Sequence, residues 1–310
     1  MANLKYYQEK VEGISKTAKV TKAMESISAI KMRFAQKKAI IDRYYSFYLF
    51  SVLKRVSKLF NKDLDNIFSQ TCDVKGKTAI VLISSDKGLT GGANNFLFKK
   101  VFSLIKEKEI KKEDLSFICI GRKGKEFVER QDWKLRRYFH ELGEKSLIDD
   151  INEVSEYVYD LYNTEEVKRV FVVYTNFKNT TTQTPEVRVV LPIVYKELRS
   201  FLKRILPTEG KYSHLDKIHI DDADVSNYLF EPSKKTFLKE LTPLILRIMI
   251  YYAMLESYAS EHSARMVAMK NATDQALNLS DRFRRKFNKE RQAIITREIS
   301  EIVSGMEAMK

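Results

Sequence analysis

The distribution of glycine and proline most restricts how this chain can fold. Residues 3–59 contain one glycine and no proline, and residues 244–310 likewise contain one glycine and no proline. The middle, residues 75–235, holds eight of the ten glycines and four of the five prolines. Because proline and glycine interrupt or end helices, both ends of the chain are predicted to be long helices, with the turns concentrated between them.

A regular spacing of apolar and small residues supports long helices at both ends. Steps of three and four residues alternate in the C-terminal part, which is typical of a coiled coil, at Leu241, Ile245, Ile248, Tyr252, Leu255, Ala259, His262, Met266, Met269, Thr273, Ala276, Leu279, Phe283 and Phe287. The N-terminal part continues the spacing with smaller residues, at Ile14, Ala18, Thr21, Glu25, Ser28, Met32, Ala35 and Ala39. A helix of 60 or more residues is roughly 90 to 100 Å long, too long to fold back into one globule. We therefore expect residues 1–60 and 236–310 to pair as a long antiparallel coiled coil.

The middle of the chain alternates apolar runs with helical patterns. This alternation predicts βαβ units and a Rossmann-like α/β domain with a mainly parallel sheet over residues 75–235. The expected strands are 78–84, 116–121, 169–175 and 186–193, and the expected helices are 95–108, 123–131 and 148–164. A polar loop is expected over residues 207–224.

Composition excludes several classes of function. The formal net charge of +14 favours anionic partners, but the charge is spread along the chain with few aromatic side chains among the basic runs, so nucleic-acid binding is not expected. Two cysteines, Cys72 and Cys119, form no disulfide framework, and the start of the chain lacks the apolar region of a signal peptide. The most apolar window, residues 244–255, is too short to span a bilayer. These features predict a protein of the reducing cytosol.

Catalytic and metal-binding motifs are not evident either. The four histidines form no HExxH motif and no Cys or His cluster has the spacing of metal ligands, nor is there a GxSxG motif. His262 lies on the apolar spacing of the C-terminal helix, where a packing role is favoured. We therefore expect no catalytic residue, no cofactor and no metal.

The stretch "SSDKGLTGG", residues 84–92, has the form of a phosphate-binding loop because it follows an apolar strand and precedes a helix. Its glycines, Gly88, Gly91 and Gly92, fit neither the Walker A spacing nor the Rossmann fingerprint. The triplet "GKT", residues 76–78, precedes a strand instead of following one. "GRKGK", residues 121–125, is basic and follows a strand, but a turn into a solvated helix is favoured. Nucleotide binding by this chain alone is therefore not expected.

Five motifs, taken together, resemble one known family. They are "VTKAMESISAIKM", "SSDKGLTGG", "YLFEPS", "ASEHSARMVAMKNATDQA" and "NKERQAIITREISEIVSG", and they occur in that family's order over nearly the whole chain. The chain resembles the gamma subunit of F-type rotary ATP synthases, the central rotor shaft. The resemblance implies a non-catalytic subunit that transmits torque, with nucleotides bound by its partners. Those partners would be a hexamer of alpha and beta subunits, an epsilon-type subunit and a membrane ring of c-type subunits, which would place the chain in the cytoplasm, peripheral on the inner face of the cell membrane.

The resemblance also implies roles for individual residues. The residues that would hydrogen-bond a catch region of the beta subunit are Arg291, Gln292, Thr296 and Glu298. Those that would lie where the shaft meets the beta-subunit lever are Met24, Lys22, Lys31 and Arg33, although packing within the coiled coil is an equal alternative for Met24. The contacts at the stalk base would be Tyr228 and Glu231, with packing inside the domain as the alternative for Tyr228. The signature loop would comprise Ser85, Asp86, Gly88, Gly91 and Gly92.

Some features depart from the family pattern and leave alternatives open. Thr90 stands where many relatives have cysteine, and residues 206–226 near the stalk base match nothing in the pattern. A divergent gamma-like paralogue, whose hexamer drives a machine without a standard proton-conducting ring, is one alternative. A free-standing coiled-coil adaptor is a second, and a small-molecule enzyme that uses the 84–92 loop is a third.

Overall fold

The computed structural model describes residues 2–41, 77–140, 147–193 and 234–309. The chain divides into two compact units. One, the two-helix unit, consists of residues 1–30 and 265–310, and the other, the sheet unit, consists of residues 31–264. Both long helices have residues in each unit.

The sheet unit contains a five-stranded sheet in the order β3-β2-β1-β4-β5. Strand β1 (Thr78–Ile83) pairs in parallel with both of its neighbours, β2 (Leu115–Ile120) and β4 (Arg169–Phe177). Strand β5 (Gln183–Leu191) pairs antiparallel with β4. Each of the four expected strands is present, and the prediction of a mainly parallel sheet is confirmed.

Strand β3 (Lys134–Phe139) was not expected from the sequence. It pairs in parallel with β2 alone, and the register shifts between Phe117 and Ile118, whose partners are Leu135 and Arg137. The intervening Arg136 is therefore an extra residue, which is a β-bulge. Because a bulge interrupts the alternation of side chains between the two faces, and because the strand carries three basic residues, no strand pattern is visible there.

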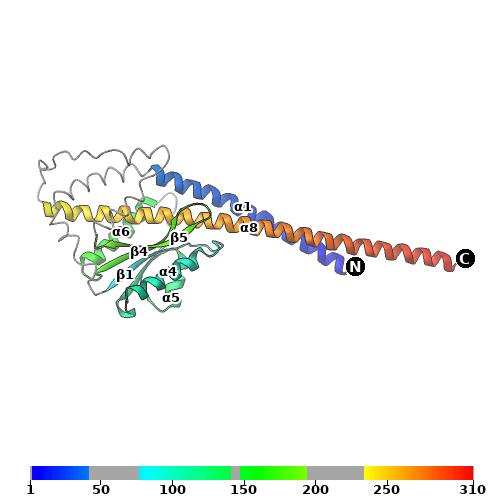
Figure 1. The fold of residues 1–310 in the computed structure, drawn as a ribbon, viewed down its shortest axis with the longest axis horizontal. Coiled ribbons are helices and arrows are strands. Elements are labelled where there is room, and N and C mark those ends of the chain that lie inside the picture. The colour runs from blue at the N-terminus through cyan, green and yellow to red at the C-terminus, as the bar shows by residue number, and fades with distance from the viewer. Residues whose placement is uncertain (1, 42–76, 141–146, 194–233, 310) are drawn as a thin grey trace. The chain divides into compact units, whose positions relative to one another are not determined.

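Helices cover both faces of the sheet (Figure 1). Alternate residues of β1 enter two separate apolar cores, so Val81 lies in one core and Leu82 in the other. The Leu82 core is completed by α4 (Ala93–Glu107) and α5 (Arg122–Arg130), and the Val81 core by α6 (Leu147–Asn163) and α8. A single-turn 3-10 helix, η1 (Lys112–Asp114), precedes β2.

The two ends of the chain are long helices, as predicted. Helix α1 spans Ala2–Ile41, and residues 42–60 of the expected N-terminal helix lie outside the described residues. Helix α8 spans Lys234–Ala308, 75 residues that include Pro243. The first part of α8 is buried in the sheet unit because its apolar residues from Leu241 to Leu255 join the Val81 core.

In the two-helix unit, α1 and α8 run antiparallel. The hydroxyl oxygens of Thr21 and Thr273 lie 2.7 Å apart, and the rings of Tyr7 and Phe283 lie 6.2 Å apart between centroids. As α1 runs from Tyr7 to Thr21, the neighbouring residues on α8 run from Phe283 back to Thr273, so the two helices have opposite directions. Ala18 is buried, as expected for a residue that lets a partner helix approach closely.

The contact between the helices becomes looser towards the end of α8. Met269 and Thr273 are buried, whereas Leu279, which lies on the predicted apolar spacing, is 43% exposed. Residues 291–309 are exposed except for a half-buried Ile294. Tyr7, close to the first described residue of α1, lies beside Phe283, and residues 291–309 of α8 follow that contact.

We predict that enlarging the small-residue contact destabilises the helix pair. Ala18→Leu adds three carbon atoms where the side chain is 5% exposed, and overpacking of this kind costs about 1–3 kcal/mol. Ala23→Leu on the exposed side of the same helix is the control and is expected to change little. Urea unfolding followed by helix circular dichroism measures both, and equal stability of the two variants would contradict the close contact.

Candidate functional site

The signature loop connects the carboxyl end of β1 to the start of α4 and turns its polar side chains inward. Ser85, Asp86 and Thr90 are 4–5% exposed. The amide nitrogen Nδ2 of Asn94 donates to Ser85 Oγ at 2.7 Å and to Thr90 Oγ1 at 3.3 Å, while Ser85 Oγ donates to the carbonyl oxygen of Lys87 at 2.9 Å. Gly91 has a φ of 58°, a left-handed conformation that glycine adopts without strain. The hydroxyls of Ser85 and Thr90 are thus bound within the protein.

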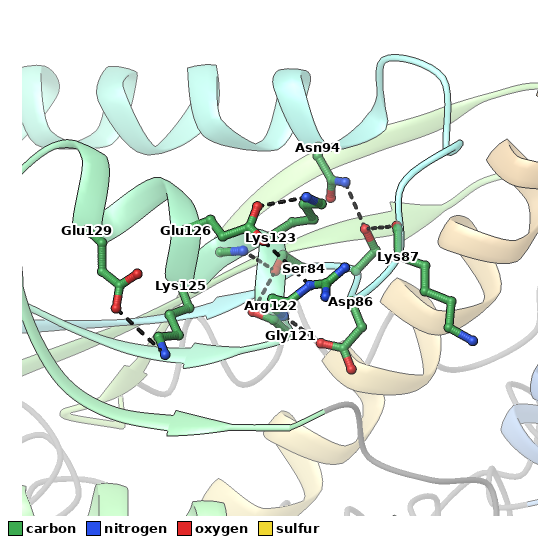
Figure 2. Close-up of polar contacts among 12 residues, drawn as sticks. Ser84, Asp86, Lys87, Asn94, Gly121, Arg122, Lys123, Lys125, Glu126 and Glu129 are labelled. Carbon is green, nitrogen blue, oxygen red and sulfur yellow. Dashed lines mark hydrogen bonds and ion pairs between the residues drawn. The ribbon is translucent and has the colours of Figure 1, made fainter.

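The beginning of the same loop caps the N-terminus of α5 (Figure 2). The backbone N–H of Arg122 donates to Asp86 Oδ1 at 2.5 Å, and that of Gly124 donates to Ser84 Oγ at 2.7 Å. Between them, the N–H of Lys123 donates to the carbonyl oxygen of Ser85 at 3.0 Å. The first N–H groups of a helix have no partner inside the helix, so three consecutive loop residues satisfy three consecutive donors.

The Asp86 carboxylate also contacts the end of β3. Asp86 Oδ2 lies 2.9 Å from Nδ1 of His140, whose side chain is 81% exposed. The pKa of the neighbouring Tyr138 phenol is raised, first by partial burial and then by the negative charge of Asp86. A single buried carboxylate thereby joins the loop after β1, the first turn of α5 and the residue that follows β3.

This geometry opposes phosphate binding at the loop. The N-terminus of a helix attracts phosphate through its free N–H groups and its partial positive charge, but here Asp86 occupies that end of α5. A phosphate at the loop would also meet the negative charge of Asp86. A recess between the loop, α4, β4 and α8 has a cavity volume of only about 10 Å³. Small-molecule sites usually measure roughly 300–1,000 Å³, so the recess is too small for a nucleotide.

Gly121, the first residue of "GRKGK", lies where the loop after β2 closely approaches the loop after β1. Gly121 has a φ of 95°, and a Cβ atom placed there would lie 2.0 Å from the carbonyl oxygen of Ser84. Ser84 Oγ in turn accepts from Gly124 N, which belongs to the first turn of α5. The expected turn into a helix at residues 121–125 is present, but α5 is solvated on one side only, because Gly124 is buried and Phe127 and Val128 enter the Leu82 core. The turn fits against the signature loop.

The residues expected to contact the beta subunit lie on two separate stretches of helix. Arg291, Gln292, Thr296 and Glu298 are all exposed on α8. Met24 and Lys31 are half-buried on α1 and Arg33 is exposed, while Lys22 pairs with Glu25 at 3.1 Å. Since Thr21 lies beside Thr273, Arg291 is about 27 Å further along α8, at ~1.5 Å per residue. The two groups therefore form distinct surfaces.

The structure describes the expected residues of the signature loop but not those of the stalk base. Ser85 and Asp86 are buried and Gly88, Gly91 and Gly92 are exposed. Tyr228 and Glu231, expected at the stalk base, lie outside the described residues. His262 is buried with its ring 4.4 Å from that of Tyr258.

The described residues contain neither a membrane-spanning helix nor a cluster of metal ligands. Within the described ranges, no helix has both the length and the apolar character needed to cross a bilayer. The same part of the chain holds no group of three or more potential metal ligands.

Sequence reasoning missed part of the loop network. Ser84, His140 and Arg122 were not assigned a role, although each provides an atom to the network around Asp86. The available signal was the position of Ser84 and His140 directly after the strands β1 and β3. Recognising it requires β3, which the bulge at Arg136 conceals.

We predict that Gly121→Ala severely destabilises the sheet unit. The new Cβ would collide with the backbone of Ser84 at a φ of 95°, and left-handed strain with overpacking costs about 3 kcal/mol or more. Gly88→Ala is the matched control in the same loop network, because nothing lies within 4 Å of its added Cβ. Thermal and urea unfolding measure both, and a Gly121→Ala variant as stable as the control would refute the packing of the two loops.

Known proteins of one family match this chain over its whole length. The family model described as ATP synthase matches residues 3–309. The gamma chain of ATP synthase from Cytophaga hutchinsonii is 35% identical over 312 residues, covering 100% of this chain and 99% of that protein. The gamma chain from Geotalea daltonii is 33% identical over 310 residues, with full coverage of both.

Solved structures show the same fold. A chain from the rotor of Euglena gracilis mitochondrial ATP synthase has a TM-score of 0.62 at 17% identity and covers 95% of this chain and 99% of its own length. A chain from the central stalk and c-ring of Tetrahymena thermophila mitochondrial ATP synthase has a TM-score of 0.57 at 21% identity, covering 82% and 99%. The family model over residues 3–309 and the full-length relatives at 33–35% identity show that the chain belongs to the ATP synthase gamma-chain family, whose members are non-catalytic subunits of that complex.

Proposed function

We propose that this gamma-family chain is the central-stalk rotor of an F1-type ATPase or ATP synthase. In this role it transmits torque between a catalytic hexamer of alpha and beta subunits and the base of the stalk. The observation that carries the proposal is helix α8, whose 75 residues run without a break from the sheet unit into the pairing with α1. At ~1.5 Å per residue its contour is about 110 Å, and pairing with a second helix stiffens it, as an axle requires.

Exposed apolar side chains on the last turns of α8 support contact with a partner. Ile295, Ile299, Ile302 and Met306 are 45–62% exposed and follow one another at intervals of three and four residues. They therefore form one stripe along the helix. Exposed apolar patches in proteins mark surfaces that another molecule covers. We assign this stripe to the interior of the hexamer, with Arg291, Gln292, Thr296 and Glu298 supplying polar contacts to the beta subunits beside it.

A second surface on α1 supports contact with the beta-subunit lever. Val20, Ile27 and Phe34 are 43–58% exposed and lie seven residues apart, on one side of the helix. Met24, Lys31 and Arg33 lie among them. An apolar stripe with basic residues suits an acidic lever that slides past, because exposed ion pairs are individually weak. The hexamer would thus be contacted at two heights along the shaft.

The assembly and its location belong to the same proposal. A sheet unit at the stalk base would contact an epsilon-type subunit and a ring of c-type subunits, with Tyr228 and Glu231 at that contact. In this proposal the shaft consists of the coiled-coil helices 1–60 and 236–310, and the base consists of the domain 75–235. The complete machine would hold the chain in the cytoplasm, peripheral on the inner face of the cell membrane.

Copurification from the native host distinguishes this proposal from its alternatives. Alpha and beta subunits together with a c-type ring and an a-type subunit would support the synthase rotor. A hexamer without a ring would instead indicate a gamma-like paralogue in a different machine, and a chain without either would indicate a free-standing adaptor. Measurable binding of millimolar ATP to the isolated chain would instead support the third alternative, a small-molecule enzyme that uses the loop at residues 84–92.

We predict that Arg291→Ala with Gln292→Ala slows ATP hydrolysis by the assembled complex. Losing two hydrogen bonds to the beta subunit, each worth about 0.5–1.5 kcal/mol, would lower the rate by a factor of about 5 to 150. The fold should be unaffected because both residues are exposed. Arg284→Ala, which removes an exposed positive charge from the same helix, is the control, and a double variant as active as this control would contradict the assignment.

A further inference from the structure

The turn between β4 and β5 is held in one conformation by a polar side chain. Oδ1 of Asn179 accepts from the backbone N–H of Thr181 at 3.0 Å and of Thr182 at 2.7 Å, and from the Thr181 hydroxyl at 2.9 Å. The two strands that leave this turn pair over eight residue pairs with one register shift. The β4–β5 hairpin is therefore a rigid element to which another element can be fastened.

Two serines of α8 fasten it to this hairpin. Ser260 Oγ donates to the carbonyl oxygen of Thr175 at 3.0 Å, and Ser263 Oγ donates to that of Thr180 at 2.8 Å. Both serines are completely buried. The amide of Gln183 at the start of β5 strengthens the second contact, because its Nε2 donates to Thr180 O at 3.0 Å and to Ser263 Oγ at 3.3 Å. We call Ser260, Ser263 and Gln183 the hairpin clamp.

The carbonyl of Thr175 needs the donor that Ser260 supplies. The residue opposite Thr175 on β5 is Pro185, which has no N–H to donate. On the other side, the pairing of β4 with β1 ends at Val173. A buried carbonyl without a partner is costly, so the hydroxyl of α8 completes the hydrogen bonding of the sheet.

Serines elsewhere in these helices behave differently. Ser28, Ser103 and Ser300 each donate to the carbonyl four residues earlier in their own helix, which is the usual arrangement. Ser260 and Ser263 instead donate to another element. Since residues three apart share a helix face, both serines point at the hairpin together.

A third polar contact lies one turn earlier on the same face of α8, between Glu256 and Tyr174 of β4. Burial, followed by the nearby carboxylate of Glu256, raises the pKa of the Tyr174 phenol on β4. Nε of the buried Arg188 on β5 donates to the Tyr174 oxygen at 2.6 Å. Glu256, Ser260 and Ser263 thus follow one another at steps of four and three residues along α8, all facing β4 and the turn that follows it.

These contacts are placed where α8 leaves the sheet unit, which ends at residue 264. Earlier turns of α8 are held by apolar packing from Leu241 to Leu255, and that packing is non-directional. Hydrogen bonds depend steeply on angle, so they add to the apolar packing a directional restraint on rotation of the helix about its own axis.

We propose that the hairpin clamp prevents α8 from turning within the sheet unit, so that torque carried by α8 reaches that unit without slip. Ser260, Ser263 and Gln183 are positioning residues in this role, because none of them is assigned to a contact with another subunit. The inference rests on the proposed rotor function, in which α8 carries load between the hexamer and the stalk base.

The test measures angular fluctuations of the sheet unit in the assembled, stalled complex. Ser260→Ala with Ser263→Ala removes both hydroxyls, and a bead on a cysteine introduced at the exposed Lys99 of α4 reports the angle. Cys72→Ser removes one native thiol, and burial raises the pKa of the Cys119 thiol to about 12, which keeps it unreactive. The angular variance should rise by about a factor of two, because two angle-dependent contacts between α8 and the hairpin are lost, while the rate of ATP hydrolysis stays unchanged.

Two controls separate a torsional role from a loss of stability. Ser116→Ala removes a buried hydroxyl that donates to Thr78 O at 3.3 Å between two strands of the same unit, and Ser300→Ala removes a hydroxyl bound within α8. Both should leave the variance unchanged. Should the double variant fail to fold, Gln183→Met, which keeps the size of the side chain and removes its donors, is the second probe.

The outcomes distinguish the clamp from the rotor function. A wild-type complex that rotates, with equal variance in the clamp variants and in Ser116→Ala, would overturn the clamp alone. A wild-type chain that assembles with no hexamer would overturn the rotor function. Hydrogen exchange of the isolated chain adds an independent measure, since residues 177–183 should exchange about five-fold faster per hydrogen bond lost.

Discussion

The structure depends on one helix that is buried in two different ways. Over its first turns, helix α8 places leucine, isoleucine and tyrosine side chains in an apolar core beneath the sheet, and beyond residue 265 it packs against α1 through small residues and threonines. No glycine lies between these regions, and the first part tolerates Pro243. Because the helix is continuous, any force on its end reaches the sheet unit through the contacts that hold α8 there. Those contacts are apolar first and become directional hydrogen bonds at Ser260 and Ser263, the last turns before the sheet unit ends.

In the signature loop, the polar groups at the edge of an architecture that commonly binds nucleotides are hydrogen-bonded within the protein. The sheet has parallel strands followed by helices, and ligands in such sheets usually bind beyond the carboxyl ends of the strands. In this protein the loop after β1 turns inward at that edge. Asp86 supplies the negative charge at the N-terminus of α5, Ser84 and Ser85 satisfy the next N–H groups, and Gly121 allows the two backbones to approach. The result is a rigid junction of three strand ends, suited to a subunit that bears load and leaves ATP chemistry to its partners.

Much of the fold could be predicted because it follows from local rules. Long segments without glycine or proline became α1 and α8, and the apolar runs became β1, β2, β4 and β5 close to their expected bounds. The exceptions have identifiable causes. Strand β3 carries a bulge at Arg136 that breaks its alternation. Leu279 keeps the apolar spacing of its helix but is exposed, although it lies between Thr273 and Phe283, which both contact α1. Periodicity describes one helix and cannot tell how closely a partner packs against each of its residues. The roles of Arg291, Gln292 and Met24 stay predictions, since they depend on subunits outside this chain.

By itself, the sequence determined which segments are helical, which are strands, and that the loop at residues 84–92 lacks the spacing of a nucleotide site. It also contained the ordered motifs by which the family is recognised. Only the tertiary structure decided that Asp86 takes the place an anion would occupy, and that Ser260 and Ser263 donate to a neighbouring hairpin instead of to their own helix. The physical reason is that backbone conformation depends on neighbours in the chain, whereas the partner of a carboxylate or hydroxyl depends on which group folding brings within about 3 Å of it.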